Sequence, residues 1–210
     1  MLLSLKGRFV FVANLKTAST AIEACLKPFS EICIARTEFG KHASFGEIET
    51  RYAWAFELIK RENFFVFGVI RDPLDYVLSV YNFHTKPEFL GQESFTGNTS
   101  FTEFYESWKK RDSWMLRPQY KRFLNSKDEY ALDYLINFEQ LADEWPKVLE
   151  ILKIPQKELR SLNVSPMGVQ RWDIEPDLAE QIYSDYATDN LLLRQYTGHS
   201  SSHENLTLPK

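Results

Sequence analysis

The chain has no long hydrophobic run and few cysteines. No stretch of its 210 residues approaches the ~20 consecutive apolar residues that a membrane-spanning helix needs, so we expect no membrane span. Its two cysteines, Cys25 and Cys33, are too few for a disulfide framework, and we interpret both as reduced thiols of a protein core. A chain of this length can bury one full core, so we expect a single domain.

The chain also lacks an excess of positive charge. Its formal net charge of -4 argues against nucleic-acid binding, which usually needs a basic surface. No group of Cys, His, Asp and Glu residues has the spacing of a metal site, so we expect no metal. The first strand is predicted to begin almost at once, which leaves no room for a signal peptide and favours a cytoplasmic location. Residues 197–210 are predicted to form a polar tail after a single domain of residues 1–196.

The glycines of a nucleotide-binding P-loop are missing. The pattern G-x-x-x-x-G-K-[ST] does not occur, yet the elements that surround such a loop are present. An apolar run at 9–13 predicts a buried strand, and a helix is predicted to follow from residue 18. A helix N-terminus presents unpaired N–H groups and the positive end of a dipole. The sequence therefore predicts a phosphate site made by Lys16, Thr17, Ala18, Ser19 and Thr20.

Strand-like and helix-like segments alternate along the chain. Strands are predicted at 8–13, 31–36, 64–70 and 130–136, and helices at 18–27, 44–61, 73–83, 101–110, 117–124, 138–152 and from 175 onward. Such alternation is typical of an α/β fold, here a P-loop-like three-layer fold with a central parallel sheet of about four or five strands flanked by helices. The polar segment 85–99 predicts a mobile loop, and 163–175 is expected to be irregular.

A second phosphate site is predicted where the third strand ends. Arg71 follows that strand directly, and Ser79 lies about two turns along the helix that begins at Pro73. Because parallel strands end at the same edge of a sheet, we expect Arg71 to lie beside Lys16. An arginine and a serine can together grip a phosphate. The two sites predict a nucleotide that carries phosphate at both ends of its ribose.

These motifs resemble those of the sulfotransferases that use 3′-phosphoadenosine 5′-phosphosulfate (PAPS). Residues 11–20 are similar to the family's 5′-phosphosulfate loop, and residues 71–73 followed by Ser79 are similar to its 3′-phosphate motif. Three later runs, at 117–119, 138–139 and 162–165, are similar to the carbohydrate-type and bacterial branch. The resemblance extends from residue 9 to about residue 196.

The resemblance implies transfer of a sulfuryl group from PAPS to a hydroxyl or amine, with adenosine 3′,5′-bisphosphate (PAP) as product. Lys16 would contact the bridging oxygen and neutralise the leaving phosphate, a role that agrees with the fixed positive charge such a transfer needs. The 5′-phosphate would be bound by Thr17, Ala18, Ser19 and Thr20, and the 3′-phosphate by Arg71 and Ser79. By analogy with basic C-terminal loops of the family, Arg171 would reach over the nucleotide.

A general base is expected in the loop that follows the second strand. His42, within the run Gly-Lys-His-Ala-Ser at 40–44, is our candidate, because several branches of the family carry a catalytic histidine in a similar loop. The near-neutral reference pKa of histidine suits proton transfer. Other branches use a glutamate, which makes Glu47 and Glu23 the next candidates.

The sequence does not name the acceptor. Segments 37–60 and 85–115 are expected to form its pocket, for a small molecule or a carbohydrate. We interpret most of the aromatic set Phe101, Tyr105, Trp108 and Trp114 as core rather than as a sugar-stacking surface. Two other functions stay open: a small-molecule kinase or NTPase that would bind ATP with Mg²⁺, and a non-catalytic nucleotide-binding or scaffolding protein on the same fold.

Overall fold

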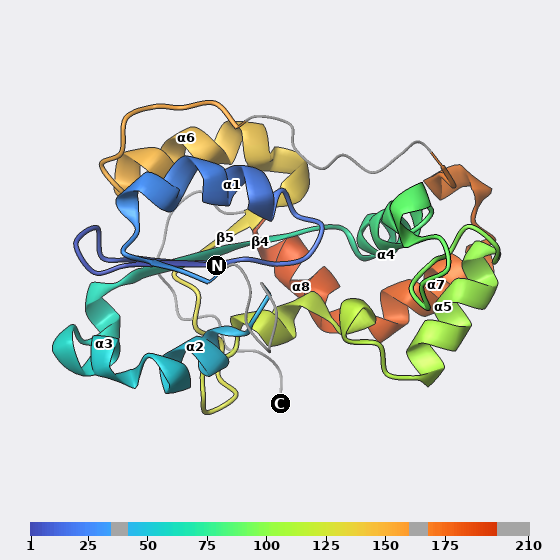
Figure 1. Ribbon diagram of the computed structural model, residues 1–210, viewed down its shortest axis with the longest axis horizontal. Coiled ribbons are helices and arrows are strands. Elements are labelled where there is room, and N and C mark those ends of the chain that lie inside the picture. The colour runs from blue at the N-terminus through green and yellow to red at the C-terminus, as the bar shows by residue number, and fades with distance from the viewer. Residues whose placement is uncertain (35–41, 160–167, 197–210) are drawn as a thin grey trace.

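The protein's structure is a computed structural model that describes residues 1–34, 42–159 and 168–196. Within these residues the fold is α/β, with a five-stranded mixed sheet in the order β3-β1-β2-β4-β5 (Figure 1). The strands are β1 (Leu2–Ser4), β2 (Phe9–Val12), β3 (Ile32–Cys33), β4 (Phe65–Ile70) and β5 (Tyr134–Asn137). Since β2 pairs in parallel with β4, and β4 with β5, their carboxyl ends share one edge of the sheet.

The prediction of an entirely parallel sheet is wrong at one side. β1 lies between β2 and β3 and pairs with both in the antiparallel sense. A tight turn, in which Arg8 has a φ of 52°, joins β1 to β2, and so short a connection can only return the chain antiparallel to itself. The three residues of β1 are buried, but a run this short carries no periodicity that sequence reasoning could use.

Helices surround the sheet and extend beyond its carboxyl edge. The α-helices are α1 (Ser19–Leu26), α2 (Phe45–Arg51), α3 (Ala53–Leu58), α4 (Pro73–Phe83), α5 (Phe101–Lys110), α6 (Leu141–Ile151), α7 (Pro176–Asp185) and α8 (Ala187–Tyr196). Short 3₁₀ helices are η1 (Lys27–Phe29), η2 (Arg61–Asn63), η3 (Pro87–Phe89), η4 (Trp114–Leu116), η5 (Gln119–Phe123), η6 (Phe138–Gln140) and η7 (Arg171–Asp173). None of the helices described is long and apolar enough to cross a membrane.

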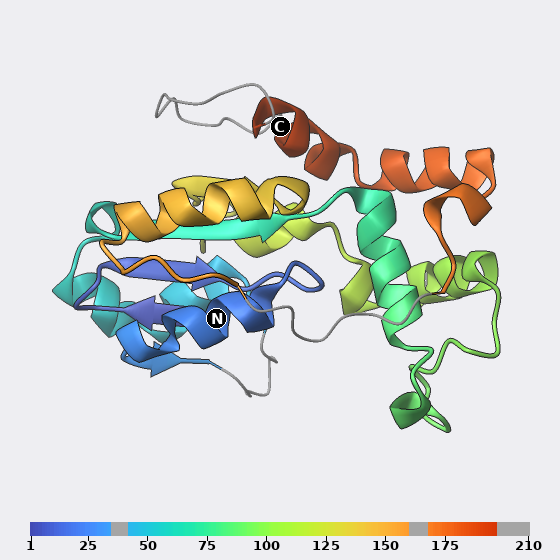
Figure 2. The same cartoon turned by 90° about the horizontal axis from the view of Figure 1, so that it is seen from above.

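The helices form two packed groups. α1 and α6 lie over one face of the sheet, while α2 and α3 lie on the other side (Figure 1). α4 continues directly from β4 and gathers with α5 and α7 beyond the end of the sheet, as Figure 2 shows from above. The buried residues divide in the same way, into one hydrophobic cluster built on the sheet and another built on α4, α5 and α7. The carboxyl ends of β2 and β4 lie where these groups meet.

Three predicted helices differ from the structure. The predicted helix 44–61 is interrupted at Tyr52, where φ is -111° and ψ is 34°, and so forms α2 and α3. The predicted last helix is interrupted at Tyr186, whose buried hydroxyl donates to the carbonyl of Leu116. Segment 117–124, predicted as a helix, contains the 3₁₀ helix η5. Long-range contacts such as that of Tyr186 are invisible to helical periodicity.

The segment 85–99, predicted as a mobile loop, is held against α4. Thr96 is buried; its hydroxyl donates to Tyr81 O at 2.8 Å and its N–H donates to His84 O at 3.2 Å. The Tyr81 hydroxyl donates in turn to Thr99 O at 2.7 Å. Polar composition alone suggested mobility, but these side-chain bonds fold the segment back onto the helix.

Candidate functional site

The loop after β2 adopts a conformation that usually requires glycine. Lys16 and Ala18 have φ values of 58° and 57°, in the left-handed region that costs a non-glycine residue about 1–2 kcal/mol. The Asn14 side chain supports this loop: its Oδ1 accepts from Leu15 N at 2.8 Å, while Thr17 Oγ1 donates to Asn14 O at 3.2 Å. The loop therefore holds two non-glycine residues in a backbone conformation that glycine adopts more easily.

The N-terminus of α1 faces the site without a side-chain cap. Its N-cap residue is Ala18, which makes no side-chain capping bond, and the first turn contains no acidic residue. Ser19 and Thr17 are both buried beside it. A helix end of this kind, with its dipole uncompensated by a carboxylate, favours an anion.

Lys16 precedes this helix end, and its surroundings disfavour the positive charge of its side chain. Its Nζ lies 3.8 Å from the centroid of the Phe83 ring on α4. Burial, with the nearby charges of Lys86 and Arg71, lowers the pKa of Lys16 to about 8. A bound anion would offset this unfavourable charge.

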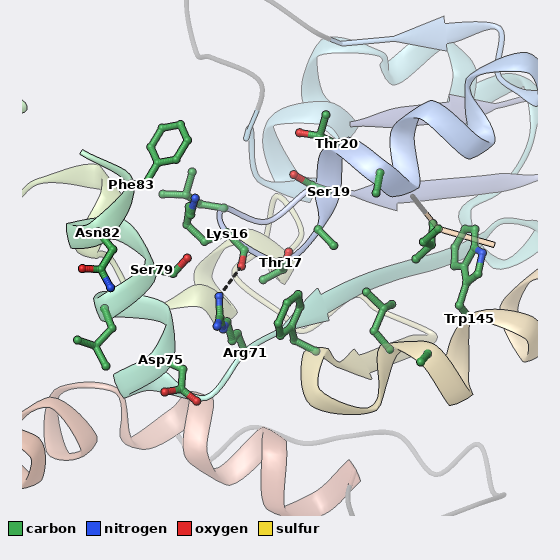
Figure 3. A pocket seen from close by; sticks show the side chains of 18 of the residues that line it. Lys16, Thr17, Ser19, Thr20, Arg71, Asp75, Ser79, Asn82, Phe83 and Trp145 are labelled. Atoms are coloured by element: carbon green, nitrogen blue, oxygen red, sulfur yellow. Dashed lines mark hydrogen bonds between the residues drawn. The ribbon is translucent and has the colours of Figure 1, made fainter. Parts of the chain in front are cut away.

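Arg71 comes from the end of β4 and points back toward the same loop. Its Nη1 donates to Lys16 O at 3.4 Å, and its guanidinium carbon lies 4.5 Å from the centroid of the Phe138 ring (Figure 3). Its Nε is 4.0 Å from Glu139 Oε1 but has no hydrogen-bond partner among the residues described, although it is buried. A buried donor without a partner is costly, and a ligand oxygen would supply the missing acceptor.

His42 lies beside the residue that joins β2 to the loop. Its Nδ1 is 3.0 Å from the carbonyl oxygen of Ala13, and Ala13 is the residue that follows β2. A carbonyl oxygen can only accept, so Nδ1 carries the proton, and the lone pair lies on Nε2. The imidazole also stacks with the ring of Trp114, with centroids 6.5 Å apart and planes inclined by 28°. This tautomer is the one that a general base acting through Nε2 requires.

The predicted donor-binding residues and the first-choice base line one cavity, whose volume is ≈ 1520 Å³; Figure 3 shows Lys16, Arg71 and Ser79 among the side chains around it. They are Lys16, Thr17, Ala18, Ser19, Thr20, His42, Arg71, Ser79 and Arg171. On the side of α6 the wall becomes more apolar and includes Phe138, Leu141 and Trp145. One continuous space therefore joins the two predicted phosphate sites, the predicted base and an aromatic wall.

A buried amide network that the sequence did not reveal joins the two predicted phosphate motifs. Gln119 Oε1 accepts from Asn14 Nδ2 at 3.0 Å and from Arg71 N at 3.1 Å. Its Nε2 donates to Arg71 O at 2.7 Å and is 3.5 Å from Asp189 Oδ2. Asp189 on α8 also accepts from the backbone N–H groups of Gln119 and Tyr120. The resemblance named Gln119 only as part of a motif; its role required knowledge of four distant segments.

Arg171 reaches the cavity wall but is engaged by carboxylates. Its Nη1 lies 3.1 Å from Asp75 Oδ2 and its Nη2 lies 3.3 Å from Asp72 Oδ2. The neighbouring Trp172 also lines the cavity and is 81% exposed. Arg171 would have to leave both carboxylates to contact a nucleotide, so its predicted role depends on a rearrangement.

The two alternative bases have partners outside the cavity. Glu47 closes the capping box of α2, where its Oε2 accepts from Ser44 N at 2.5 Å. Glu23 pairs with the amino group of Met1. Neither carboxylate lines the cavity, which leaves His42 as the best-placed of the three.

The aromatic residues of segment 101–114 divide as the sequence predicted. Phe101, Tyr105 and Trp108 are buried in the cluster around α4 and α5, which confirms their assignment to the core. Trp114 is 45% exposed and packs against His42 instead. Of this set, Trp114 is therefore the residue that packs outside the buried cluster, against the candidate base.

Comparison with known proteins assigns no family to the chain. No protein-family model matches it, and neither a curated protein nor a solved structure does.

Proposed function

We propose that this protein is a PAPS-dependent sulfotransferase. The observation that carries the proposal is the convergence of Lys16 and Arg71, from the ends of two directly paired parallel strands, on one cavity. The uncapped N-terminus of α1 lies beside Lys16, and Ser79 on α4 points into the same space as Lys16 and Arg71 (Figure 3). Two separate anion sites at one sheet edge suit a nucleotide with phosphate on both sides of its ribose.

The residues present fit such a donor. The 5′-phosphosulfate would be held by Lys16, Thr17, Ala18, Ser19 and Thr20. The 3′-phosphate would be held by Arg71, whose buried Nε lacks a hydrogen-bond partner among the residues described, and by Ser79. The apolar wall with Phe138 and Trp145 would accommodate the planar base by stacking. A charged donor would thus compensate the uncapped end of α1, the buried charge of Lys16 and the buried Nε of Arg71.

The chemistry follows from the positions of Lys16 and His42. PAPS supplies an activated sulfuryl group; the acceptor oxygen forms the new S–O bond as the bond from sulfur to the phosphate oxygen breaks. Nε2 of His42 would take the proton from the acceptor hydroxyl. The ammonium of Lys16 would neutralise the charge that develops on the leaving phosphate. The acceptor is proposed to be a hydroxyl or amine of a small molecule or a carbohydrate, whose reacting atom would lie near His42 in the cavity that this residue lines.

A thermal-shift comparison tests the proposal without knowledge of the acceptor. PAP should raise the melting temperature in the absence of added metal, since a ligand at about 100 times its Kd stabilises a protein by about 2.7 kcal/mol. Arg71→Ala should abolish most of the shift. A shift with ATP and Mg²⁺ but none with PAP would instead identify the kinase or NTPase. PAP binding without any turnover of PAPS would identify the non-catalytic alternative.

A further inference from the structure

Arg122 contacts the backbone on which His42 lies. It belongs to η5, the same short helix that carries Gln119. Its Nη1 donates to the carbonyl of His42, and its Nη2 donates to Trp114 O at 3.4 Å. The hydroxyl of Tyr76 on α4, whose own proton goes to Met115 O at 2.6 Å, is a third hydrogen-bond partner of the guanidinium.

Among the residues described, the hydrogen-bond partners of Arg122 are neutral oxygens from three separate segments, while the carboxylate of Glu47 favours its charged form without a hydrogen bond. A partly buried guanidinium usually meets a carboxylate, because an uncompensated charge in a low-dielectric site is costly. Burial accordingly lowers the pKa of Arg122. The guanidinium is a planar fork of N–H donors, which can bridge several fixed carbonyls at once. We therefore interpret the buried position of Arg122 as a requirement for this geometry.

His42 is consequently held at two points. Its ring is held by the bond from Nδ1 to Ala13 O, and its main chain is held by Arg122. Arg122 also fixes the main chain of Trp114, whose ring stacks against the imidazole. Removal of the guanidinium would therefore release the backbone of the histidine and the ring that packs against it together.

We infer that Arg122 is a positioning residue, which sets where Nε2 of His42 lies relative to Lys16. The inference rests on the proposed function in so far as His42 is the base. Arg122 itself does not line the cavity and so has no direct contact with the proposed donor. Its effect should appear in the transfer step and not in nucleotide affinity.

The test compares Arg122→Met and Arg122→Lys with the control Arg117→Met. Arg117 is also an arginine near η5, but it is 52% exposed and pairs with Asp112. For both Arg122 variants we expect turnover of PAPS to fall about 10- to 100-fold, as for a small displacement of a reacting group. The Kd of PAP by calorimetry should stay within about threefold of wild type. Lysine should not restore turnover, because an ammonium cannot reproduce the fork.

A second readout follows the imidazole directly. The ¹⁵N resonances of the His42 ring, assigned with His42→Asn, should report the Nδ1–H tautomer in the wild type and a mixture of tautomers in Arg122→Met. This readout needs no PAPS, so it distinguishes the two proposals. A wild type without PAP binding or turnover overturns the proposed function, while the imidazole spectra still test Arg122.

Several outcomes would overturn the positioning role. Wild-type turnover and unchanged His42 resonances in Arg122→Lys or Arg122→Met would do so. A loss of PAP affinity as large as the loss of turnover would point to a binding role instead. If both Arg122 variants fail to fold while Arg117→Met folds normally, Arg122 serves the fold alone and the inference is wrong.

Discussion

Nδ1 of His42 lies 3.0 Å from the carbonyl oxygen of Ala13. Ala13 directly follows β2 and precedes the loop that carries Lys16, so the candidate base and the candidate leaving-group stabiliser are anchored to the end of one strand. Any shift of the loop would carry the imidazole with it. This connection explains how Lys16 and His42, which are 26 positions apart in the sequence, can keep a fixed position relative to each other in one cavity.

His42→Asn should separate proton transfer from structure. The asparagine amide can still donate to Ala13 O, but it cannot accept a proton. We expect turnover to fall by about 10²- to 10⁴-fold, with PAP affinity near wild type and without the acidic limb of the pH–rate profile. The measurement is PAPS turnover, with hydrolysis by water as the reaction if no acceptor is known. Retention of most activity would mean that the base lies elsewhere.

Arg71→Ala and Lys16→Ala should affect different steps. Arg71→Ala removes a charge-assisted partner of the 3′-phosphate and should weaken PAP binding. Lys16→Ala should act mainly on transfer, by about 10²- to 10³-fold, as the loss of a group that stabilises developing charge. Calorimetric titration with PAP and turnover of PAPS measure the two effects. Unchanged PAP affinity in Arg71→Ala would show that the 3′-phosphate is bound elsewhere.

PAP affinity should depend on pH through Lys16. In the free protein the pKa of Lys16 is lowered to about 8 by burial, Lys86 and Arg71, and a bound phosphate would raise it again. Above about pH 8 binding must therefore take up a proton, so log Kd should rise by up to about one unit per pH unit. Below about pH 8 the protonation of Lys16 should not change log Kd. Calorimetry in buffers of different ionisation enthalpy measures the uptake, and Lys16→Met should abolish it.

Gln119→Met should destabilise the fold and loosen the site. It removes the partners of both backbone groups of Arg71 and one of the two partners of Asn14 Nδ2, which also donates to Val69 O. Each buried polar group left without a partner costs about 1–3 kcal/mol. Urea denaturation should show this loss, whereas Gln92→Met, at an exposed amide that bonds Glu88 O, should be near neutral. Equal stability of the two variants would contradict the importance of the network.

Asp189 should make stability depend on pH. Burial raises the pKa of Asp189 to about 7. The hydrogen bonds from Tyr120 and Gln119 favour the carboxylate and lower the pKa, but burial has the larger effect. Because this pKa exceeds the value of 3.8 expected for the unfolded chain, the folded state binds more protons between about pH 4 and about pH 7. The contribution of Asp189 to the free energy of unfolding should thus fall as pH rises through this window. Urea denaturation of wild type and Asp189→Asn across the window measures it; parallel pH profiles would contradict the prediction.

Local sequence patterns determined the frame of this protein. Apolar runs placed β2, β4 and most of β5, and the first-turn proline and following periodicity placed α4 at Pro73–Phe83. The order of strand and helix was enough to bring Lys16 and Arg71 to one edge, because parallel strands end on the same side. These features depend on residues that are neighbours in the sequence, and composition and period can reveal them.

Only the tertiary structure decided the rest. The sequence around Gln119 does not predict its hydrogen bonds with Asn14, Arg71 and Asp189, because each bond joins segments at least 48 residues apart. The local sequence also does not predict the hydrogen bond from the Arg122 guanidinium to His42 O, because these residues are 80 positions apart. A buried polar group is satisfied by whichever partner the packed fold brings near, and that choice has no local signature. Lys16 and Ala18 show this most directly: their left-handed conformations oppose local preference and persist in a loop held by distant contacts.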